Sequence, residues 1–192
     1  RPGSIILFDS GVVATVEKRL DDRYELTFNR PDKLEGLGSI PLPPYITRPP
    51  VDQDAATYQT VFAHYDGSVA APTAGLHFSH AFLDDVRASG VEIVFITLHV
   101  GPGTFQPVRA EHITDHRMHA EEFNVSTDAA VALNRAMVEG RRVVAVGTTT
   151  TRVMEHLMRQ HGAIMAGKGS TDLFITPGFS FQIVQAMVTN FH

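Results

Sequence analysis

The chain has 192 residues, 43% of them hydrophobic, which suits one medium domain, or a domain with a small companion, around a sizeable core. It has no cysteine, which excludes a disulfide framework, a thiolate metal site and a cysteine nucleophile, and agrees with a cytoplasmic location. The net charge of −5 argues against a protein that is basic over its whole surface, although a local basic patch could still bind nucleic acid.

No segment is long and apolar enough to span a bilayer, and nothing resembles a signal peptide. The chain opens on Arg1 rather than methionine and stops at His192, just after an apolar run. We therefore expect a fragment of a longer protein.

The first part of the chain predicts a small antiparallel β unit. Three strands are expected at residues 4–8, 12–18 and 24–28, with turn-forming residues between them. The prolines of segment 41–46 require an extended backbone, because each proline disfavours the helical region for the residue before it. A domain boundary is therefore expected near residue 40.

Two helices are expected next. Apolar and aromatic residues recur at helical spacing in segment 52–64, and Ser79 is placed to cap a helix that ends near Ser89, before Gly90. Between them, segment 68–78 consists of small residues around one proline and one glycine. Small residues allow a ligand, or equally another element, to approach the backbone closely, so both interpretations stay open.

The run Val91–Leu98 is apolar on both faces and rich in β-branched residues, which predicts a strand buried on both sides in a mostly parallel sheet. His99 follows, and then a loop to Arg109 with two glycines and two prolines. Open α/β sheets bind ligands beyond the carboxyl ends of their strands, so this loop is the expected place for chemistry.

His116 and His119 lie three residues apart and close to Glu121. Imidazole and carboxylate groups together suit several divalent metal ions, although exposed histidines in a polar loop would give the same pattern. Phe123–Val125 is expected to be a short strand, and a helix is expected from Ser126 to about Glu139.

A second buried strand is expected at residues 142–146, leading through Gly147 into a helix to about His161. The threonines at the start of this helix either bind an anion or cap the helix. Residues 163–170 are expected to form a loop, and strands are expected at 172–175 and 183–189.

Four blocks of this sequence stand in the order and approximate spacing of the S-adenosylmethionine:tRNA ribosyltransferase-isomerase family, which the chain resembles over nearly its whole length. The blocks are Pro-Leu-Pro-Pro-Tyr-Ile (41–46), Ala-Ala-Pro-Thr-Ala-Gly-Leu-His-Phe (70–78), the segment 97–108 with His-Arg-Met-His-Ala-Glu (116–121), and 144–152 leading to Val-Thr-Asn-Phe-His (188–192). Thr150 departs from the serine of the family but keeps a hydroxyl.

The resemblance implies a mixed-sheet α/β core, here residues 41–192 and incomplete, with a small inserted antiparallel β-barrel domain to which residues 1–40 would belong. It also implies a monomer without metal or separate cofactor. Its co-substrate would be S-adenosylmethionine, whose ribosyl part is moved onto 7-aminomethyl-7-deazaguanine at the wobble position of tRNA. The product would be epoxyqueuosine in tRNA, with release of adenine and methionine.

Histidine can exchange protons near neutral pH, so we predict His99 and His119 as the acid/base pair, with Glu121 orienting one imidazole and His77 as a further catalytic candidate. The predicted substrate-binding residues are Thr73, Gly75, Gly101, Gly103, Thr104, Phe105, Gln106, His116, Thr148, Thr149, Arg152, Asn190 and His192.

Roles can be suggested for some of these residues. Thr148, Thr149 and Arg152 would hold the methionine carboxylate or a tRNA phosphate, Gln106 and Asn190 would contact a purine-like edge, and Phe105 would stack on a base. Phe105 could equally be a core residue, and the glycines could simply form turns. Arg152 lies in the first turn of its helix, where the dipole disfavours a cation, so an anion is expected beside it.

Two other functions remain open. One is a metal-dependent hydrolase that uses His116, His119 and Glu121, and the other is a non-catalytic RNA-binding module. The ribosyl-transfer interpretation requires that His99, His119, Thr148 and Asn190 converge above one sheet edge.

Overall fold

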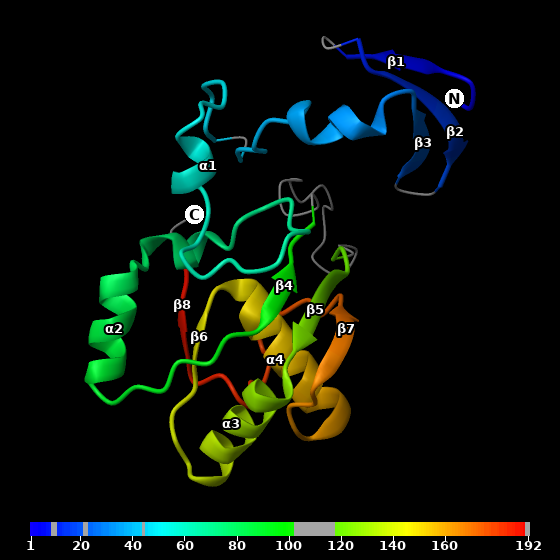
Figure 1. The fold of residues 1–192 in the computed structure, drawn as a ribbon. Coiled ribbons are helices and arrows are strands. Elements are labelled where there is room, and N and C mark those ends of the chain that lie inside the picture. Colours follow the sequence, from blue (N-terminus) through cyan, green and yellow to red (C-terminus); the bar gives the residue numbers. More distant parts are fainter. Residues whose placement is uncertain (9–10, 21–22, 44, 102–117, 191–192) are drawn as a thin grey trace. The chain divides into compact units, whose positions relative to one another are not determined.

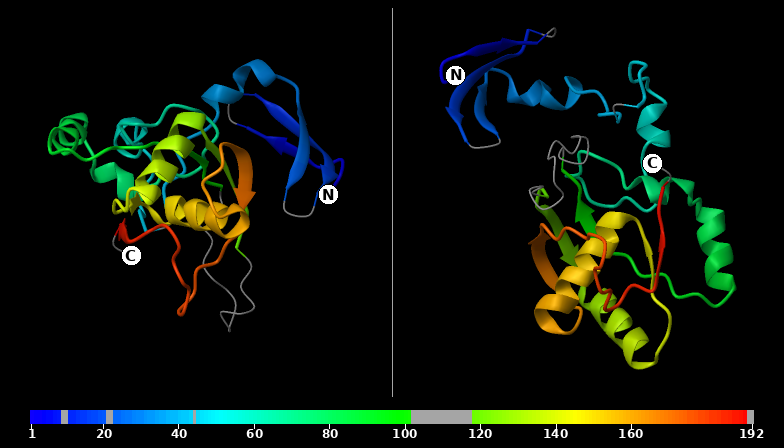
Figure 2. Two further views of the ribbon diagram at one scale, coloured as in Figure 1. Left: turned by 90° about the horizontal axis from the view of Figure 1, so that it is seen from below. Right: turned by 180° about the vertical axis from the view of Figure 1, so that it is seen from behind.

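The computed structural model describes residues 1–8, 11–20, 23–43, 45–101 and 118–190 (Figure 1). The chain divides into two compact units, Arg1–Ile40 and Pro41–His192. Their helices and strands can be followed along the chain in the further views of Figure 2. None of the helices within the described ranges is long and apolar enough to cross a membrane.

The first unit is a three-stranded antiparallel sheet in the order β1-β2-β3, followed by the 3-10 helix η1 (Pro31–Gly36). The strands are β1 (Ile5–Leu7), β2 (Val13–Arg19) and β3 (Tyr24–Phe28), which confirms the three predicted strands. Val12, Ala14 and Val16 are buried, as the two-residue period of a strand with one covered face requires. Membership of this unit in a β-barrel domain stays a prediction.

The second unit holds two small sheets. The antiparallel sheet has the order β4 (Thr97–His99), β5 (Glu121–Val125), β7 (Gly167–Thr171), and the parallel sheet pairs β6 (Val144–Val146) with β8 (Ala186–Val188). The helices are α1 (Asp54–Thr57), the 3-10 helix η2 (Thr73–His77), α2 (His80–Ala88), α3 (Thr127–Val138) and α4 (Thr148–His161). The structure confirms a mixed α/β architecture.

Three of the helices begin or end at residues that the sequence indicates. The Ser79 hydroxyl accepts a hydrogen bond from the Phe82 N–H at 3.1 Å, and the Ser126 hydroxyl accepts one from Ala129 at the same distance. Gly162 ends α4 in the left-handed region, with φ at 68°. Because these signals are local, α2, α3 and α4 form close to their predicted bounds.

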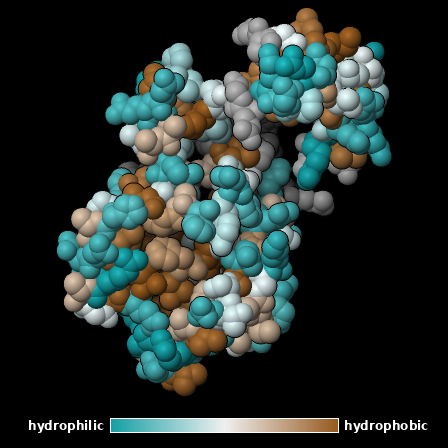
Figure 3. Space-filling model, in the orientation of Figure 1, coloured by the Kyte–Doolittle hydropathy of each residue, from teal (hydrophilic) through white to brown (hydrophobic). Residues whose placement is uncertain are grey.

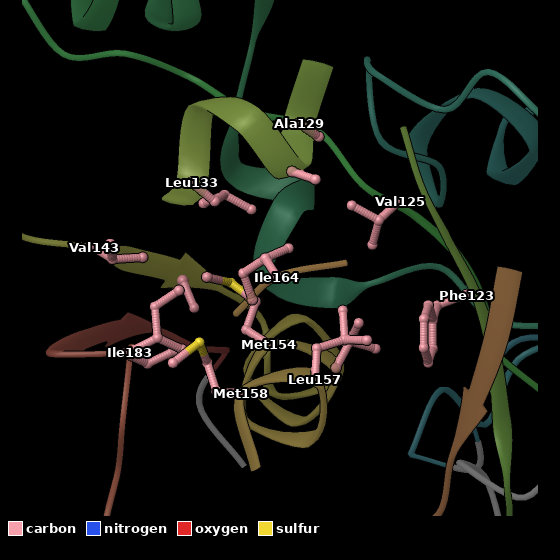
Figure 4. Packing of buried hydrophobic residues seen from close by; sticks show 14 residues of the cluster. Phe123, Val125, Ala129, Leu133, Val143, Met154, Leu157, Met158, Ile164 and Ile183 are labelled. Atoms are coloured by element: carbon pink, nitrogen blue, oxygen red, sulfur yellow. The ribbon is translucent and has the colours of Figure 1, made fainter. Parts of the chain in front are cut away.

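The core of the second unit lies between α4, α3 and the sheets (Figure 4). One face of α4 contributes Val153, Met154, Leu157 and Met158, and β5 contributes alternate residues. A Cβ on Gly169 would lie 2.6 Å from the Phe123 ring on the neighbouring strand. Glycine is therefore required at this point of β7 so that the phenyl ring can cover the strand.

The predicted central strand Val91–Leu98 is wrong in length, burial and direction. Only Thr97–His99 is a strand, and it runs antiparallel to β5. The side chain of Val91 is 53% exposed and that of Phe95 is 45% exposed. The space-filling view shows that the second unit has apolar residues on its surface (Figure 3). Within the described ranges no strand pairs with residues 91–96, so the apolar pattern of this run is not matched by a sheet on both sides.

The helix predicted over residues 52–64 is limited to α1. The Asp54 carboxylate at its start is buried and binds Arg48 through two hydrogen bonds of 2.6 and 2.7 Å and the Val51 N–H at 2.8 Å. Phe62 lies beyond α1 and packs on Phe95, with ring centroids 5.4 Å apart. The aromatic spacing in this segment therefore reflects packing of a turn-rich chain rather than one helical face.

The end of the chain also differs from the prediction. The expected loop 163–170 contains β7, and the expected strand 172–175 is absent. The expected strand 183–189 is shortened to β8, because the N–H groups of residues 182–184 donate to the buried carboxylate of Glu155 instead of a neighbouring strand. Long-range hydrogen bonds decide both outcomes.

Candidate functional site

Four strand ends that adjoin predicted site residues lie at one end of the second unit. The carboxyl ends of β4, β6 and β8 and the amino end of β5 all lie at this end (Figure 1; Figure 2). β6 and β8 share a direction because they are parallel, and β5 begins where β4 ends because the two are antiparallel. His99, His119, Thr148 and Asn190 each belong to one of these strand ends.

His77 and Asn190 are in direct contact. His77 Nε2 and Asn190 Oδ1 are 3.0 Å apart, which joins η2 to the segment after β8. The Gly147 N–H donates to the Val188 carbonyl at 2.8 Å, so the start of α4 lies beside the same strand end. Gly147 has a φ of 93°, which a residue with a side chain rarely adopts. The structure thus brings His77, Asn190 and the start of α4 together.

Thr148 and Thr149 form the first turn of α4. Thr148 is exposed and Thr149 half-buried, and no side-chain hydrogen bond caps this helix at Gly147. Thr151, one turn on, is buried, and its hydroxyl donates to the Gly147 carbonyl at 3.1 Å. The proposed contact of Thr148 and Thr149 with an anion stays a prediction.

His99 lies on a polar face of the antiparallel sheet. This outer face turns away from the core, and its side chains form two cross-strand rows, because residues paired across antiparallel strands point to the same side. The rows are Thr97–Asn124–Lys168 and His99–Glu122–Ser170. Together with Tyr65 and Asp66, these six residues line a hollow of about 690 Å³.

A neighbouring segment fixes His99 in place. The Ser68 hydroxyl bridges the backbone of β4, with 3.0 Å to the Leu98 carbonyl and 3.1 Å to the Val100 N–H. A Cβ on Gly67 would lie 2.9 Å from His99 Nδ1, so the chain passes directly against the imidazole. Nδ1 is buried and has no hydrogen-bond partner within the part of the chain that the structure describes.

Arg152 forms a buried ion pair with Glu121. Its Nη1 lies 2.7 Å from Glu121 Oε2, and both side chains are only 8% exposed. Nε donates to the Leu173 carbonyl at 2.7 Å, and Nη2 donates to the carbonyls of Thr171 at 3.3 Å and His119 at 3.5 Å. The guanidinium therefore holds α4, β5 and β7 together.

These contacts bear on the predicted roles of Arg152 and Glu121. The anion that the helix dipole requires beside Arg152 is the carboxylate of Glu121, so the assignment of Arg152 to a substrate carboxylate or phosphate is replaced by a structural role. Glu121 was expected to orient an imidazole; its Oε2 accepts a hydrogen bond from the guanidinium, and this contact leaves that role a prediction. Glu122, the next residue, points to the opposite face of β5 and is the residue paired with His99.

The remaining predicted residues fall into four groups. His119 is exposed just before β5, and its carbonyl is held by Arg152. Thr73 and Gly75 lie in η2, where a Cβ on Gly75 would come within 2.7 Å of the Phe62 ring, so this glycine serves packing. Gly101 is half-buried at the end of β4. The residues that lie outside the described ranges are Gly103, Thr104, Phe105, Gln106, His116 and His192.

The metal alternative proposed His116, His119 and Glu121 as ligands. Glu121 uses a carboxylate oxygen for Arg152, and no cluster of three His, Asp or Glu side chains among the described residues is placed to hold a metal ion. Since His116 is outside those residues, this alternative is not tested further.

Sequence reasoning missed Glu122, Asn124, Lys168 and Ser170. The run Glu121–Val125 alternates in burial, and this period of two could have separated Glu122 and Asn124 from the core-facing Glu121 and Phe123. No comparable signal marks β7, whose sequence Gly-Lys-Gly-Ser-Thr lacks apolar residues.

Comparison with known proteins agrees with the resemblance. A family model described as "Queuosine biosynthesis protein" matches residues 1–192. Among the curated relatives, proteins of Geotalea uraniireducens (strain Rf4) and Syntrophotalea carbinolica are 50% and 49% identical over 197 residues, covering 100% of this chain and 57% of each relative. A protein of Cupriavidus metallidurans is 48% identical over 193 residues, covering 99% of the chain and 55% of the relative. All three are named S-adenosylmethionine:tRNA ribosyltransferase-isomerase.

Among solved structures, an S-adenosylmethionine tRNA ribosyltransferase from Thermotoga maritima is similar with a TM-score of 0.47 and 26% identity, over 100% of this chain and 51% of that one. The chain thus spans just over half the length of the curated relatives it matches.

Proposed function

Because the chain belongs to the family of queuosine biosynthesis proteins, we propose that it forms part of an S-adenosylmethionine:tRNA ribosyltransferase-isomerase. The reaction moves the ribosyl part of S-adenosylmethionine onto 7-aminomethyl-7-deazaguanine at the wobble position of tRNA and rearranges it to epoxyqueuosine. Adenine and methionine leave. The enzyme works as a cytoplasmic monomer and needs no metal or separate cofactor.

The observation that supports this proposal is that strand ends from distant segments, each adjoining a candidate residue, lie at one end of the second unit (Figure 1). His99 is the last residue of β4, His119 precedes β5, and Asn190 follows β8, where it contacts His77. A reaction that joins a nucleoside sulfonium to a tRNA base needs such a site, because two large substrates must be held in line.

The proposed chemistry requires proton transfer to and from two places. The positive sulfonium acidifies the hydrogens on the adjacent ribose carbon and makes methionine a good leaving group, so a base is needed there. A proton donor is needed at the departing adenine. His99 and His119 take these two roles, since imidazole can act as acid or base near neutral pH. Asn190 is a positioning residue that holds the His77 ring.

The test is a product assay with the full polypeptide that contains this chain. S-adenosylmethionine and tRNA bearing 7-aminomethyl-7-deazaguanine should release adenine and methionine in equal amounts, while tRNA with ordinary guanine should release neither. His99→Ala and His119→Ala should each lower the rate at least about a hundredfold, as loss of a general acid or base does. His161→Ala, at the exposed far end of α4, is the matched control and should be fully active.

The same assay separates the alternatives. Tight tRNA binding without adenine release would indicate an RNA-binding module, and loss of activity to a chelator would indicate a metal-dependent enzyme. Unchanged turnover in His99→Ala or His119→Ala would remove that residue from the mechanism.

A further inference from the structure

The outer face of the antiparallel sheet carries charges of both signs. Glu122 and Lys168 are exposed on β5 and β7, and both line the hollow of about 690 Å³ that also contains His99. Neither side chain forms an ion pair with another residue of the described ranges. Glu122 and Lys168 are therefore both available to a ligand in the hollow.

The strand register places these two charges close together without pairing them. Lys168 is opposite Asn124 and Glu122 is opposite Ser170, so the two are diagonal neighbours on the same face. Diagonal side chains across an antiparallel pair start roughly 7–8 Å apart, and both chains are flexible. A ligand group of the size of an amino acid can thus contact both at once.

The charge pattern selects the kind of group that fits. A simple anion would be repelled by Glu122 and by Asp66, which also lines the hollow, and a simple cation would be repelled by Lys168. A group with both a carboxylate and an ammonium satisfies the two sides. The uncharged donors and acceptors of Asn124, Ser170 and Thr97 lie between and beside the charges.

We propose that the outer face of the β4-β5-β7 sheet binds the zwitterionic amino-acid end of S-adenosylmethionine, with Lys168 on the carboxylate and Glu122 on the ammonium. This inference rests on the proposed function for the identity of the ligand. His99 is in the same cross-strand row as Glu122, so it stands on the side of the site where the sulfonium follows the amino-acid end.

The inference assigns the methionine carboxylate to a different cation from the one expected from the sequence. Arg152 is committed to Glu121 and to three backbone carbonyls, and it is buried. Lys168 is the exposed cation in the hollow that contains His99. The amino-acid end therefore lies on the solvent side of β5, not between β5 and α4.

The test measures binding of three nucleosides to the full polypeptide by calorimetry in the absence of tRNA. S-adenosylmethionine and S-adenosylhomocysteine both contain the amino-acid end, whereas 5′-methylthioadenosine lacks it. Lys168→Met and Glu122→Gln should each weaken the first two ligands about tenfold, as loss of one well-placed charge contact does, and leave the third unchanged. Lys168→Arg keeps the cation and should bind all three ligands nearly as the unsubstituted protein does.

Lys18→Met and Glu17→Gln, both on the exposed end of β2 in the first unit, are matched controls and should leave all three affinities unchanged. If Lys168→Met and Glu122→Gln bind S-adenosylhomocysteine as tightly as the unsubstituted protein does, the inference is overturned. It is also overturned if the substitutions weaken all three ligands by the same factor. Circular dichroism confirms that each variant is folded before binding is measured.

Product release separates this inference from the proposed function. If the unsubstituted protein binds S-adenosylmethionine through Lys168 but releases no adenine with the modified tRNA, the proposed reaction fails and the binding site stands. If it releases adenine and Lys168→Met does so with an unchanged KM for S-adenosylmethionine, the site fails and the reaction stands.

Discussion

Glu155 is a buried carboxylate that stabilises the segment leading into β8. It is fully buried in α4, and it accepts hydrogen bonds from three backbone N–H groups, those of Gln182 at 2.8 Å, Ile183 at 3.1 Å and Val184 at 2.9 Å. Glutamine at this position keeps the shape but removes the charge and replaces one oxygen with an NH₂ group. Glu155→Gln should therefore destabilise the protein without creating a cavity.

The size of the effect follows from these three bonds. The amide oxygen can replace Oε1, which serves Ile183 and Val184, and each of these bonds weakens by about 1 kcal/mol when the acceptor becomes neutral. The NH₂ group then faces the Gln182 N–H, a part-buried donor that is left without a partner at a cost of about 1–3 kcal/mol. The free energy of unfolding should fall by about 3–5 kcal/mol.

Urea unfolding followed by circular dichroism measures this change. With a slope of about 2 kcal/mol per molar urea, the midpoint should fall by about 1.5–2.5 M. Glu139→Gln is the control, because Glu139 pairs with Arg141 at an exposed site and its loss should cost at most about 1 kcal/mol. A fall below 1 kcal/mol for Glu155→Gln would show that the carboxylate does not hold this segment.

Three further changes test other parts of the structure. Gly169→Ala places a Cβ 2.6 Å from the Phe123 ring and should cost about 1–3 kcal/mol in urea unfolding; an unchanged midpoint would mean that the ring moves freely. Arg152→Lys cannot reproduce the fork that joins Glu121 to three carbonyls, and should lower the stability of the ligand-free protein by about 2–4 kcal/mol; unchanged stability would return Arg152 to the list of substrate contacts. The hydrogen bonds from Arg48, and to a lesser extent from the Val51 N–H, lower the pKa of Asp54 from 3.8 to about 2. The ionised Asp54 carboxylate therefore contributes its full stabilisation above pH 4, and this is lost as the pH falls through 2. A carboxyl titration by NMR with a midpoint near 4 would contradict this pairing.

Local signals in the sequence were sufficient for the elements they belong to. Ser79, Ser126 and Gly162 satisfy helix ends through bonds to residues three or four positions away, so α2, α3 and α4 could be predicted. β7 could not, because its polar and glycine residues become a strand only by pairing with β5, some 45 residues earlier. The prediction of a strand over Val91–Leu98 was wrong for the opposite reason. An apolar pattern does not show whether a neighbouring strand is present to pair with it.

The candidate site was predicted by residue type better than by role. His99, His119, Thr148 and Asn190 lie at or next to strand ends, whereas His77 ends the 3-10 helix η2. The sequence does not show which of the adjacent residues Glu121 and Glu122 faces the core. The phase of β5 decides this, and it places Glu121 inside and Glu122 outside. The partners of Arg152 were hidden because three of them are backbone carbonyls, which no side-chain pattern reveals.

Arg152 and Glu155 are three positions apart on α4, and each is committed to a different sheet, Arg152 to β5 and β7 and Glu155 to the chain entering β8. The helix therefore fixes the distance between the antiparallel sheet that contains His99 and the segment after β8 that contains Asn190, the partner of His77. Inserting a single residue between them would rotate one anchor by about 100° relative to the other. The antiparallel sheet and the segment after β8 would then no longer be held in a fixed relative position, even though every candidate site residue remained in the sequence.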